Sequence, residues 1–245
     1  MADDAVHKEL APTGKLRVAI AVGPSPSALF TVRDVGGRPR GVPVTLGVAL
    51  AKKLGLPAEF VVYKASGEIT EAADSGVWDV TFMPYDVERA KKADPGAAYH
   101  LLQSTYMVAP GSSIQNVADV NRAGVRIVGV KDTATFRASV AASPQAAHIA
   151  AAAPADALQL LQAGKADAIA LSRESLGGLL GKLPGARILD GGFLNSVTAV
   201  WVPRGKPAAL AYVSEFIEEA KASGLVRRAF DDIGLKDAVV APAGR

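Results

Sequence analysis

Short apolar runs alternate along this chain with longer amphipathic segments. Runs of about four to eight mostly aliphatic residues, bounded by polar or turn residues, predict buried β-strands. They occur at residues 16–22, 59–63, 80–82, 104–109, 125–130, 168–171 and 199–202. Strands that alternate with helices are typical of a mostly parallel, doubly wound sheet, so the pattern predicts an α/β fold.

The amphipathic segments between these strands predict helices. Residues 44–54 form one, followed by Gly55, a residue that readily takes the left-handed conformation at a helix C-terminus. A long helix is predicted over residues 207–223, which open with a proline. A shorter helix around Leu158 is closed by Gly164.

Two stretches, residues 76–89 and 164–172, repeat one order of residue types. Each has a glycine, a short polar segment, a predicted buried strand and polar residues that follow the strand. Asp86 and Arg89 follow the first strand, and Ser172 follows the second. We expect these two strand ends at one cleft, where a fixed guanidinium faces an anion. The pattern favours a binder of small anions over an enzyme.

Composition narrows the class of protein. Of 245 residues, 49% are hydrophobic and 21% charged, which is typical of a globular chain. The net charge of +3 is small, and the basic residues are interspersed with acidic ones along the chain, which argues against nucleic acid as the main partner. No apolar run reaches the roughly 18 residues of a membrane span, and there is no cysteine for disulfide or thiol chemistry.

The first nine residues are acidic and lack both a basic segment and an apolar segment, so the sequence predicts no secretory leader here. The expected location is the periplasm if a leader was removed, and the cytoplasm otherwise. Polar turns at residues 110–113 and 191–196 interrupt the strand and helix order. We predict lobe one at residues 1–109 and 196–245, with lobe two, residues 110–195, inserted.

Four motifs in order carry a resemblance to a known family. Residues 37–44 resemble its turn G-x-x-x-G-F-D-V-D-L-A, and residues 76–80 resemble G-K-Y-D-V. Residues 87–90 are similar to T-P-E-R, and residues 129–135 to G-V-x-x-G-T-T. The chain resembles the type 2 periplasmic solute-binding proteins of ABC transporters, in the polar amino-acid class, over roughly residues 13–235.

The resemblance implies a monomeric two-lobed clamshell without a cofactor, each lobe a mostly parallel sheet flanked by helices. Its lobes would close over one small ligand and deliver it to an ABC permease. Residues 104–109 and 197–202 would form the hinge strands. Such a protein binds its ligand without chemical change, and the ligand shifts the open–closed equilibrium through interactions that only the closed form offers.

The resemblance also implies roles for particular residues. Arg89 matches the arginine that forks a ligand carboxylate, whereas Ser172 stands where the family has an aspartate for the α-ammonium group. A hydroxyl cannot offset the desolvation of an ammonium ion, which costs several kcal/mol. We therefore predict a carboxylate without a conventional α-ammonium group, unless Asp86, Glu68 or Asp132 supplies the missing charge.

The expected ligand-binding set has four parts. Arg89 would hold the carboxylate, and the backbone near Asp132–Thr135 would donate to an anion. Ser172 would be a neutral hydrogen-bonding group, and Tyr85 or Phe30 would form an apolar wall. The full set is Arg89, Asp86, Tyr85, Ser66, Asp132, Thr133, Thr135, Ser172 and Phe30.

These residues also have purely structural explanations. Arg89 could pair with Asp86 or Glu88 on the surface, and Ser172 could touch no ligand. Thr133 and Thr135 could cap a helix that begins near Phe136, which would still leave backbone N–H groups for an anion. Trp78 is expected to be a packing residue.

Enzymatic interpretations have less support. The three histidines, His7, His100 and His148, are far apart in sequence and form no metal-site or triad pattern. No phosphate-binding loop, dinucleotide motif or nucleophile elbow is present. The enzymatic branch with this fold is the cyclohexadienyl dehydratases, for which Glu68, Asp86 or Glu174 could be the general acid. A soluble ligand sensor or adaptor is a third alternative.

Overall fold

The computed structural model describes residues 4–22, 30–64, 66–131 and 133–244. The chain divides into two compact units. Residues up to Leu101 and from Val197 onward form unit 1, and Leu102–Ser196 form unit 2. The predicted lobes are residues 1–109 with 196–245, and residues 110–195. That these lobes move as independent bodies remains a proposal. Among the described residues, no helix is long and apolar enough to span a membrane.

The strands of unit 1 are built around β1. They are β1 (Leu16–Val22), β2 (Phe30–Arg33), β3 (Pro39–Arg40), β4 (Ala58–Tyr63), β5 (Val80–Pro84) and β12 (Val239–Val240). Two longer strands, β6 (Ala93–Val108) and β11 (Leu194–Pro203), contribute residues to both units. Strands β2, β4 and β5 pair with β1 in parallel, whereas β11 pairs with β5 antiparallel. The predicted strand at 104–109 is thus the end of a much longer one.

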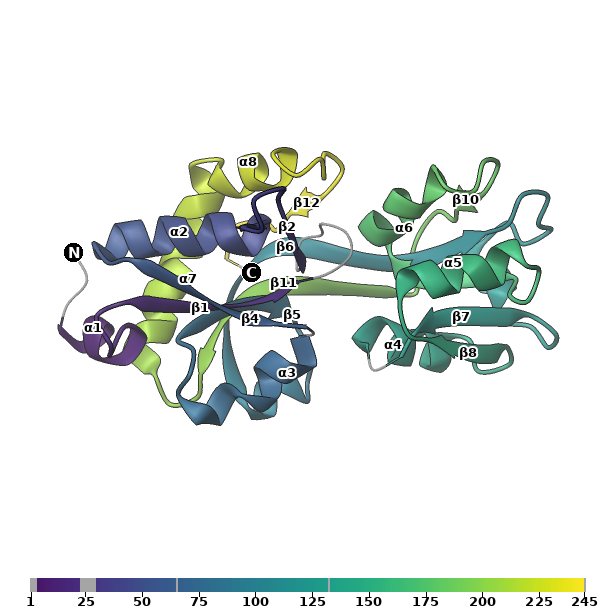
Figure 1. Ribbon diagram of the computed structural model, residues 1–245. Helices are drawn as coiled ribbons and strands as arrows, with labels where there is room; N and C mark the ends of the chain where they lie inside the picture. The colour runs from purple at the N-terminus through teal and green to yellow at the C-terminus, as the bar shows by residue number, and fades with distance from the viewer. Residues whose placement is uncertain (1–3, 23–29, 65, 132, 245) are drawn as a thin grey trace. The chain divides into compact units, whose positions relative to one another are not determined.

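Helices cover both faces of these strands. They are α1 (Asp4–Leu10), α2 (Val42–Leu54), α3 (Ser66–Glu71), α7 (Pro207–Ala222) and α8 (Leu225–Asp231), with short 3₁₀ turns η1 (Ala73–Ser75) and η2 (Arg89–Lys91). In Figure 1, α2 and α8 lie on one side of the strands and α3 on the other. Gly55 ends α2 with φ 72°, which confirms the predicted left-handed cap.

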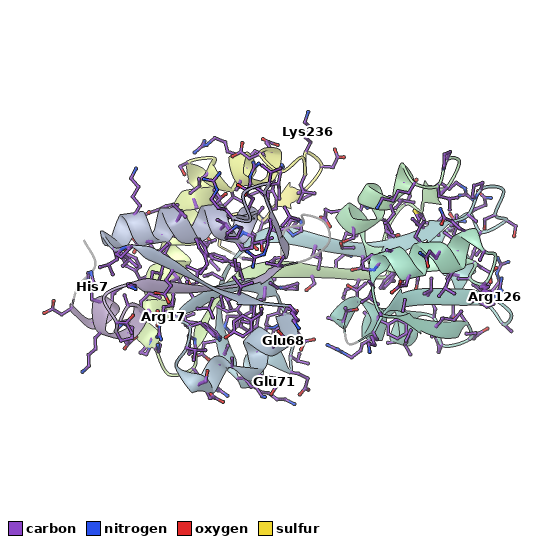
Figure 2. All side chains as sticks on the ribbon, in the orientation of Figure 1. His7, Arg17, Glu68, Glu71, Arg126 and Lys236 are labelled. Carbon is purple, nitrogen blue, oxygen red and sulfur yellow. The ribbon has the colours of Figure 1, made fainter. Side chains whose placement is uncertain are left out.

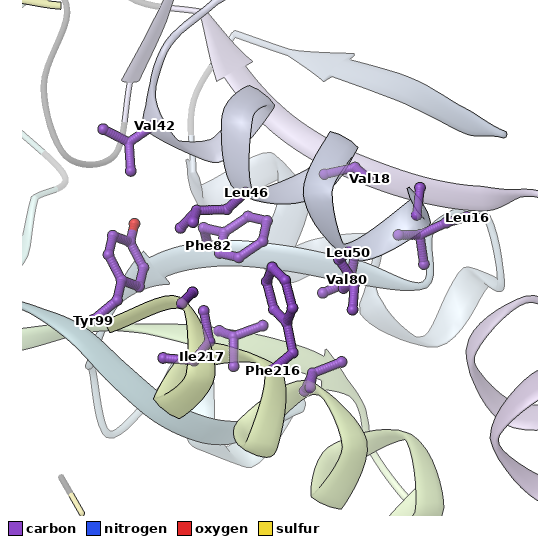
Figure 3. Packing of buried hydrophobic residues seen from close by; sticks show 14 of the residues in the cluster. Leu16, Val18, Val42, Leu46, Leu50, Val80, Phe82, Tyr99, Phe216 and Ile217 are labelled. Carbon is purple, nitrogen blue, oxygen red and sulfur yellow. The ribbon is translucent and has the colours of Figure 1, made fainter. Parts of the chain in front are cut away.

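Helix α2 packs closely on β1. A Cβ atom at Gly47 would lie 3.0 Å from the Cγ atoms of Val18, so only glycine fits this contact without a shift. The main core on this side joins β1, β5, α2 and α7, and Figure 3 shows part of it. The labelled residues are Leu16, Val18, Val42, Leu46, Leu50, Val80, Phe82, Tyr99, Phe216 and Ile217.

A second core lies against α3 on the other face of the unit 1 strands. It includes Ile69 from α3, Met83 from β5 and Trp201 from β11. Trp78 belongs to it as well, since its side chain is buried and its indole Nε1 donates to the carbonyl of Ile69 at 3.1 Å. Trp78 is therefore a packing residue, as predicted.

Unit 2 has its own set of strands and helices. They are β7 (Arg126–Val130), β8 (Ala147–Ala151), β9 (Ala168–Ser172), β10 (Arg187–Ile188), η3 (Val117–Val120), α4 (Ala134–Ala142), α5 (Pro154–Gln162) and α6 (Arg173–Leu180). Strands β8 and β9 flank β7 in parallel, and β6 pairs with β9 antiparallel. Strand β8 falls in an alanine-rich segment that the periodicity does not identify as a strand.

The position of α4 depends on a glycine in β7. A Cβ atom at Gly129 would lie 2.5 Å from the ring of Phe136, so the absence of a side chain lets this ring lie directly on the strand. Helix α4 begins at Ala134, two residues before the position that we predicted. Phe136 thus fixes the first turn of α4 against β7.

Both units contain the same Arg–Asp ion pair at the start of neighbouring parallel strands. In unit 1, Asp79 precedes β5 and its Oδ2 accepts from the backbone N and the Nε of Arg17, both at 2.9 Å. Its Oδ1 accepts from Arg17 Nη2 at 2.6 Å, and its own N–H donates to the Arg17 carbonyl. The pair therefore fixes the register of β5 against β1.

In unit 2 the same four bonds join Asp167, just before β9, to Arg126, the first residue of β7. Figure 2 labels Arg17 and Arg126, each near the start of its strand. The guanidinium of Arg126 lowers the pKa of Asp167, chiefly through the side-chain hydrogen bonds. The pairs differ in exposure, since the Asp79 side chain is 0% exposed and that of Asp167 is 34% exposed.

This difference predicts unequal stability losses. We expect Asp79→Asn to lower the free energy of unfolding by about 3 to 5 kcal/mol, because it leaves a largely buried guanidinium without its counter-charge. Asp167→Asn removes an equivalent but more exposed charge, and we expect a clearly smaller loss. Urea denaturation of the two variants measures both losses. Equal losses would contradict this account.

Candidate functional site

The candidate site in unit 1 begins where β5 ends. Pro84 is paired with Thr198 of β11, and the N–H of Tyr85 donates to the carbonyl of Val197 at 2.8 Å. The chain then turns, because Oδ1 of Asp86 accepts from the backbone N–H groups of Glu88 and Arg89, at 3.0 and 3.2 Å. This turn leads into η2, whose first residue is Arg89.

The Arg89 side chain returns to the end of β5. Its Nε donates to Thr70 Oγ1 at 3.0 Å, its Nη2 to Ser66 Oγ at 3.4 Å, and its Nη1 to the carbonyl of Pro84. Ser66 and Thr70 both belong to α3, one turn apart. These three oxygens fix the position of the guanidinium at the end of β5. The structure thus brings the predicted residues Arg89 and Ser66 together.

An indole ring links Arg89 to Tyr85. The Arg89 Cζ lies 5.9 Å from the centroid of the Trp201 ring, a cation–π distance. The Tyr85 ring stacks on the same indole, with centroids 6.0 Å apart and an interplanar angle of 27°. Sequence reasoning missed Trp201 and Thr70. Thr70 lies one helical turn after Ser66, a spacing that could have identified it, whereas Trp201 reaches the site only through the register of β11 against β5.

Two acidic residues that were considered as substitutes for the family's aspartate lie in unit 1. Asp86 holds the turn that leads into η2. Glu68 holds another turn, because its Oε2 accepts from the backbone N–H of Lys64 at 2.9 Å; Figure 2 labels Glu68 on α3. Burial raises the pKa of the neighbouring Tyr63, and the charge of Glu68 adds to the rise.

The candidate residues of unit 2 gather around the end of β9. Ser172 is the last residue of β9 and the N-cap of α6. Its Oγ accepts from the backbone N–H of Ser175 at 3.3 Å and donates to the Ser175 hydroxyl at 2.9 Å. The exit of β9 therefore presents hydroxyl groups that also stabilise the first turn of α6.

A second pair of hydroxyl groups joins the neighbouring strand β6 to α4. Ser104 of β6 is the direct cross-strand partner of Ser172, so the two side chains share one face of the sheet. The buried Ser104 Oγ lies 3.3 Å from Thr135 Oγ1, in the first turn of α4. Ser104 was missed by sequence reasoning, which treated its strand only as a hinge.

Thr133 has the capping role that the sequence suggested. Its Oγ1 accepts from the backbone N–H of Phe136 at 3.1 Å and donates to the Val130 carbonyl at 2.8 Å, so it is the N-cap of α4. Of the other predicted site residues, Phe30 begins β2. Asp132 and the loop before Phe30 lie outside the described residues.

The histidines lie in three different elements. His7 is in α1, His148 in β8, and His100 in β6, where its Nδ1 lies 3.2 Å from Thr198 Oγ1. In the part of the chain that the structure describes, no three acidic or histidine side chains cluster closely enough to hold a metal ion.

The sequence matches the model of one protein family. This is the family of bacterial extracellular solute-binding proteins, family 3, and the match spans residues 18–233. This chain belongs to that family. The match covers the end of β5 with Arg89 and the end of β9 with Ser172, and it confirms the predicted membership. Among curated proteins, none matches the sequence significantly.

Solved structures confirm the type 2 periplasmic binding protein fold. An ancestral amino acid-binding protein, described as a precursor of cyclohexadienyl dehydratase, has a TM-score of 0.78 at 24% identity, over 92% of this chain and 98% of its own. A putative binding component of an ABC transporter from Wolinella succinogenes, complexed with lysine, has a TM-score of 0.79 at 18% identity, over 90% and 96%. The solute receptor for L-cysteine of Neisseria gonorrhoeae has a TM-score of 0.77 at 20% identity, over 94% and 93%.

Proposed function

We propose that this family 3 solute-binding protein binds a small carboxylate that lacks an α-ammonium group and delivers it to an ABC permease. In this proposal the protein acts outside the cytoplasmic membrane. In this proposal Arg89 of unit 1 holds the ligand carboxylate, and hydroxyl groups of unit 2 contact the ligand's other polar groups. The observation that carries the proposal is Ser172, which ends β9 with a neutral helix cap where the family resemblance expects an acid.

The argument rests on the cost of burying an ammonium ion. An ammonium group that leaves water needs a counter-charge, since its desolvation costs several kcal/mol. Ser172, Ser175, Ser104 and Thr135 offer dipoles and no full negative charge. Asp86 and Glu68, the described acids that could replace the family's aspartate, direct carboxylate oxygens toward backbone N–H groups of their own turns. A ligand with oxygen atoms in place of the ammonium group fits these donors better.

Arg89 is suited to the carboxylate role by its anchoring. Its hydrogen bonds to Thr70 and Pro84 reduce the side-chain entropy that binding would otherwise cost. A charge-assisted bond between a held guanidinium and a carboxylate is among the strongest polar contacts in proteins. The ligand-binding roles of Asp86, Ser66, Thr133, Thr135 and Phe30 remain part of the proposal.

Arg89→Ala tests the carboxylate role directly. We expect binding to weaken by about 2 to 5 kcal/mol, since the partner charge would be left without its guanidinium. Calorimetry with carboxylates selected by a thermal-shift panel measures the change. Arg38→Ala, which removes an exposed arginine of the same unit, is the matched control and should bind as wild type does. An unchanged dissociation constant for Arg89→Ala would remove Arg89 from the site.

Ser172→Asp tests the ligand's charge. Aspartate is as good an N-cap as serine, so the start of α6 should be retained while a negative charge is added. We expect weaker binding of the native carboxylate and new binding of an α-amino acid, both seen in thermal shifts. Ser172→Asn keeps the cap without the charge and should not gain amino-acid binding. Micromolar binding of a standard α-amino acid by the wild type would refute the proposed ligand class.

Dehydratase activity is the alternative function, because a precursor of cyclohexadienyl dehydratase has the same fold. We expect stabilisation by ligand without turnover, since Asp86 and Glu68 accept from the backbone of their own turns. Glu174, the third candidate acid, lies in the first turn of α6. Incubation with prephenate and arogenate, followed by absorbance, measures product formation. Protein-dependent formation of phenylpyruvate or phenylalanine would favour the enzyme, and heat-inactivated protein is the control.

A further inference from the structure

The Tyr85 ring is partly exposed and stacks on a buried indole. The residue is 43% exposed, whereas Trp201, on which its ring stacks, is fully buried. The indole is fixed in turn, because its Nε1 donates to the carbonyl of Met83 at 2.9 Å. The Tyr85 backbone is held by its bond to Val197. The phenol ring therefore has a set orientation although much of it faces solvent.

The guanidinium of Arg89 is anchored on the same indole. The Arg89 Cζ and the Tyr85 ring both lie within about 6 Å of the Trp201 centroid. Arg89 also donates to the carbonyl of Pro84, the residue before Tyr85. A cation and an exposed aromatic ring are thus tied to one rigid group, both within unit 1, at the end of β5.

This juxtaposition fits one class of ligand. A guanidinium recognises a carboxylate, and an exposed, fixed aromatic ring gains about 0.5 to 1.5 kcal/mol from stacking on a second ring beyond the burial of apolar area. Trp201 is already covered by its own core, so its burial alone does not require an aromatic side chain at position 85. Leucine would cover apolar area equally well but would not stack.

We propose that the ligand is a monocyclic arylcarboxylate, with its carboxylate on Arg89 and its ring on Tyr85. This inference rests on the proposed function and narrows its ligand class. It also assigns Tyr85 as the residue that selects aromatic over saturated rings.

The test compares pairs of probes that differ only in aromaticity. Benzoate, phenylacetate and 3-phenylpropionate are each titrated against the wild type beside cyclohexanecarboxylate, cyclohexylacetate and 3-cyclohexylpropionate. We expect at least one aromatic probe to bind about two- to tenfold tighter than its saturated counterpart, the ratio that stacking provides. Equal or weaker binding of all aromatic probes, or no binding of any at millimolar concentration, would overturn the inference.

Variants of Tyr85 assign the preference to its ring. Tyr85→Phe should keep the aromatic-to-saturated ratio, and Tyr85→Leu should reduce it to about one while saturated probes still bind. Val87→Ala, at an exposed neighbouring position, should leave the ratio unchanged. A ratio that survives Tyr85→Leu, with folding verified by circular dichroism, would overturn the role of Tyr85.

The two proposals fail in different ways. If Arg89→Ala abolishes binding of aliphatic carboxylates but no pair shows an aromatic preference, the arylcarboxylate inference is wrong and the proposed function stands. If phenylalanine binds much more tightly than 3-phenylpropionate with Tyr85-dependent affinity, the ring contact is supported, the amine-free ligand class is wrong, and the ligand is an aromatic amino acid.

Discussion

Parallel strands have no hairpin to set their register, so something else must align them before a binding site can form at their ends. In this protein an arginine and an aspartate do so, once in each unit. Arg17 with Asp79, and Arg126 with Asp167, exchange both backbone and side-chain hydrogen bonds where the paired strands begin. A register slip of one residue would turn every side chain of β5 or β9 to the opposite face.

At the other ends of these strands, antiparallel neighbours complete the arrangement. In unit 1 the register of β11 against β5 brings Met83 and Tyr85 to the same face as Trp201, so that one buried indole supports both Tyr85 and Arg89. In unit 2 the register of β6 against β9 places Ser172 opposite Ser104. The candidate ligand residues therefore depend on two kinds of alignment, the ion pairs of the parallel strands and the ladders of their antiparallel neighbours.

Much of the fold could be predicted because the central strands are short aliphatic runs bounded by glycine. The repeated order of glycine, polar step and strand proved to mark Asp79 and Asp167, although their partners Arg17 and Arg126 could not be identified from sequence, since each lies some forty or more positions away. Strand β8 was missed because alanine carries no strand periodicity. Helix α4 begins two residues before the expected position near Phe136, and its N-cap is Thr133, one of the two caps that the sequence allowed.

The candidate site was harder to predict than the fold for a related reason. Arg89 and Ser172 lie in motifs that are continuous in sequence. Register and packing bring Trp201 and Thr70 to Arg89 in unit 1, and Ser104 to Ser172 in unit 2. The end of β9 also shows how a side-chain charge could change while the fold is kept. The first turn of α6 needs a side-chain oxygen to accept from the Ser175 N–H, and serine or aspartate meets that need equally. Because the local structure does not distinguish the two residues, the helix cap alone does not determine the charge at position 172.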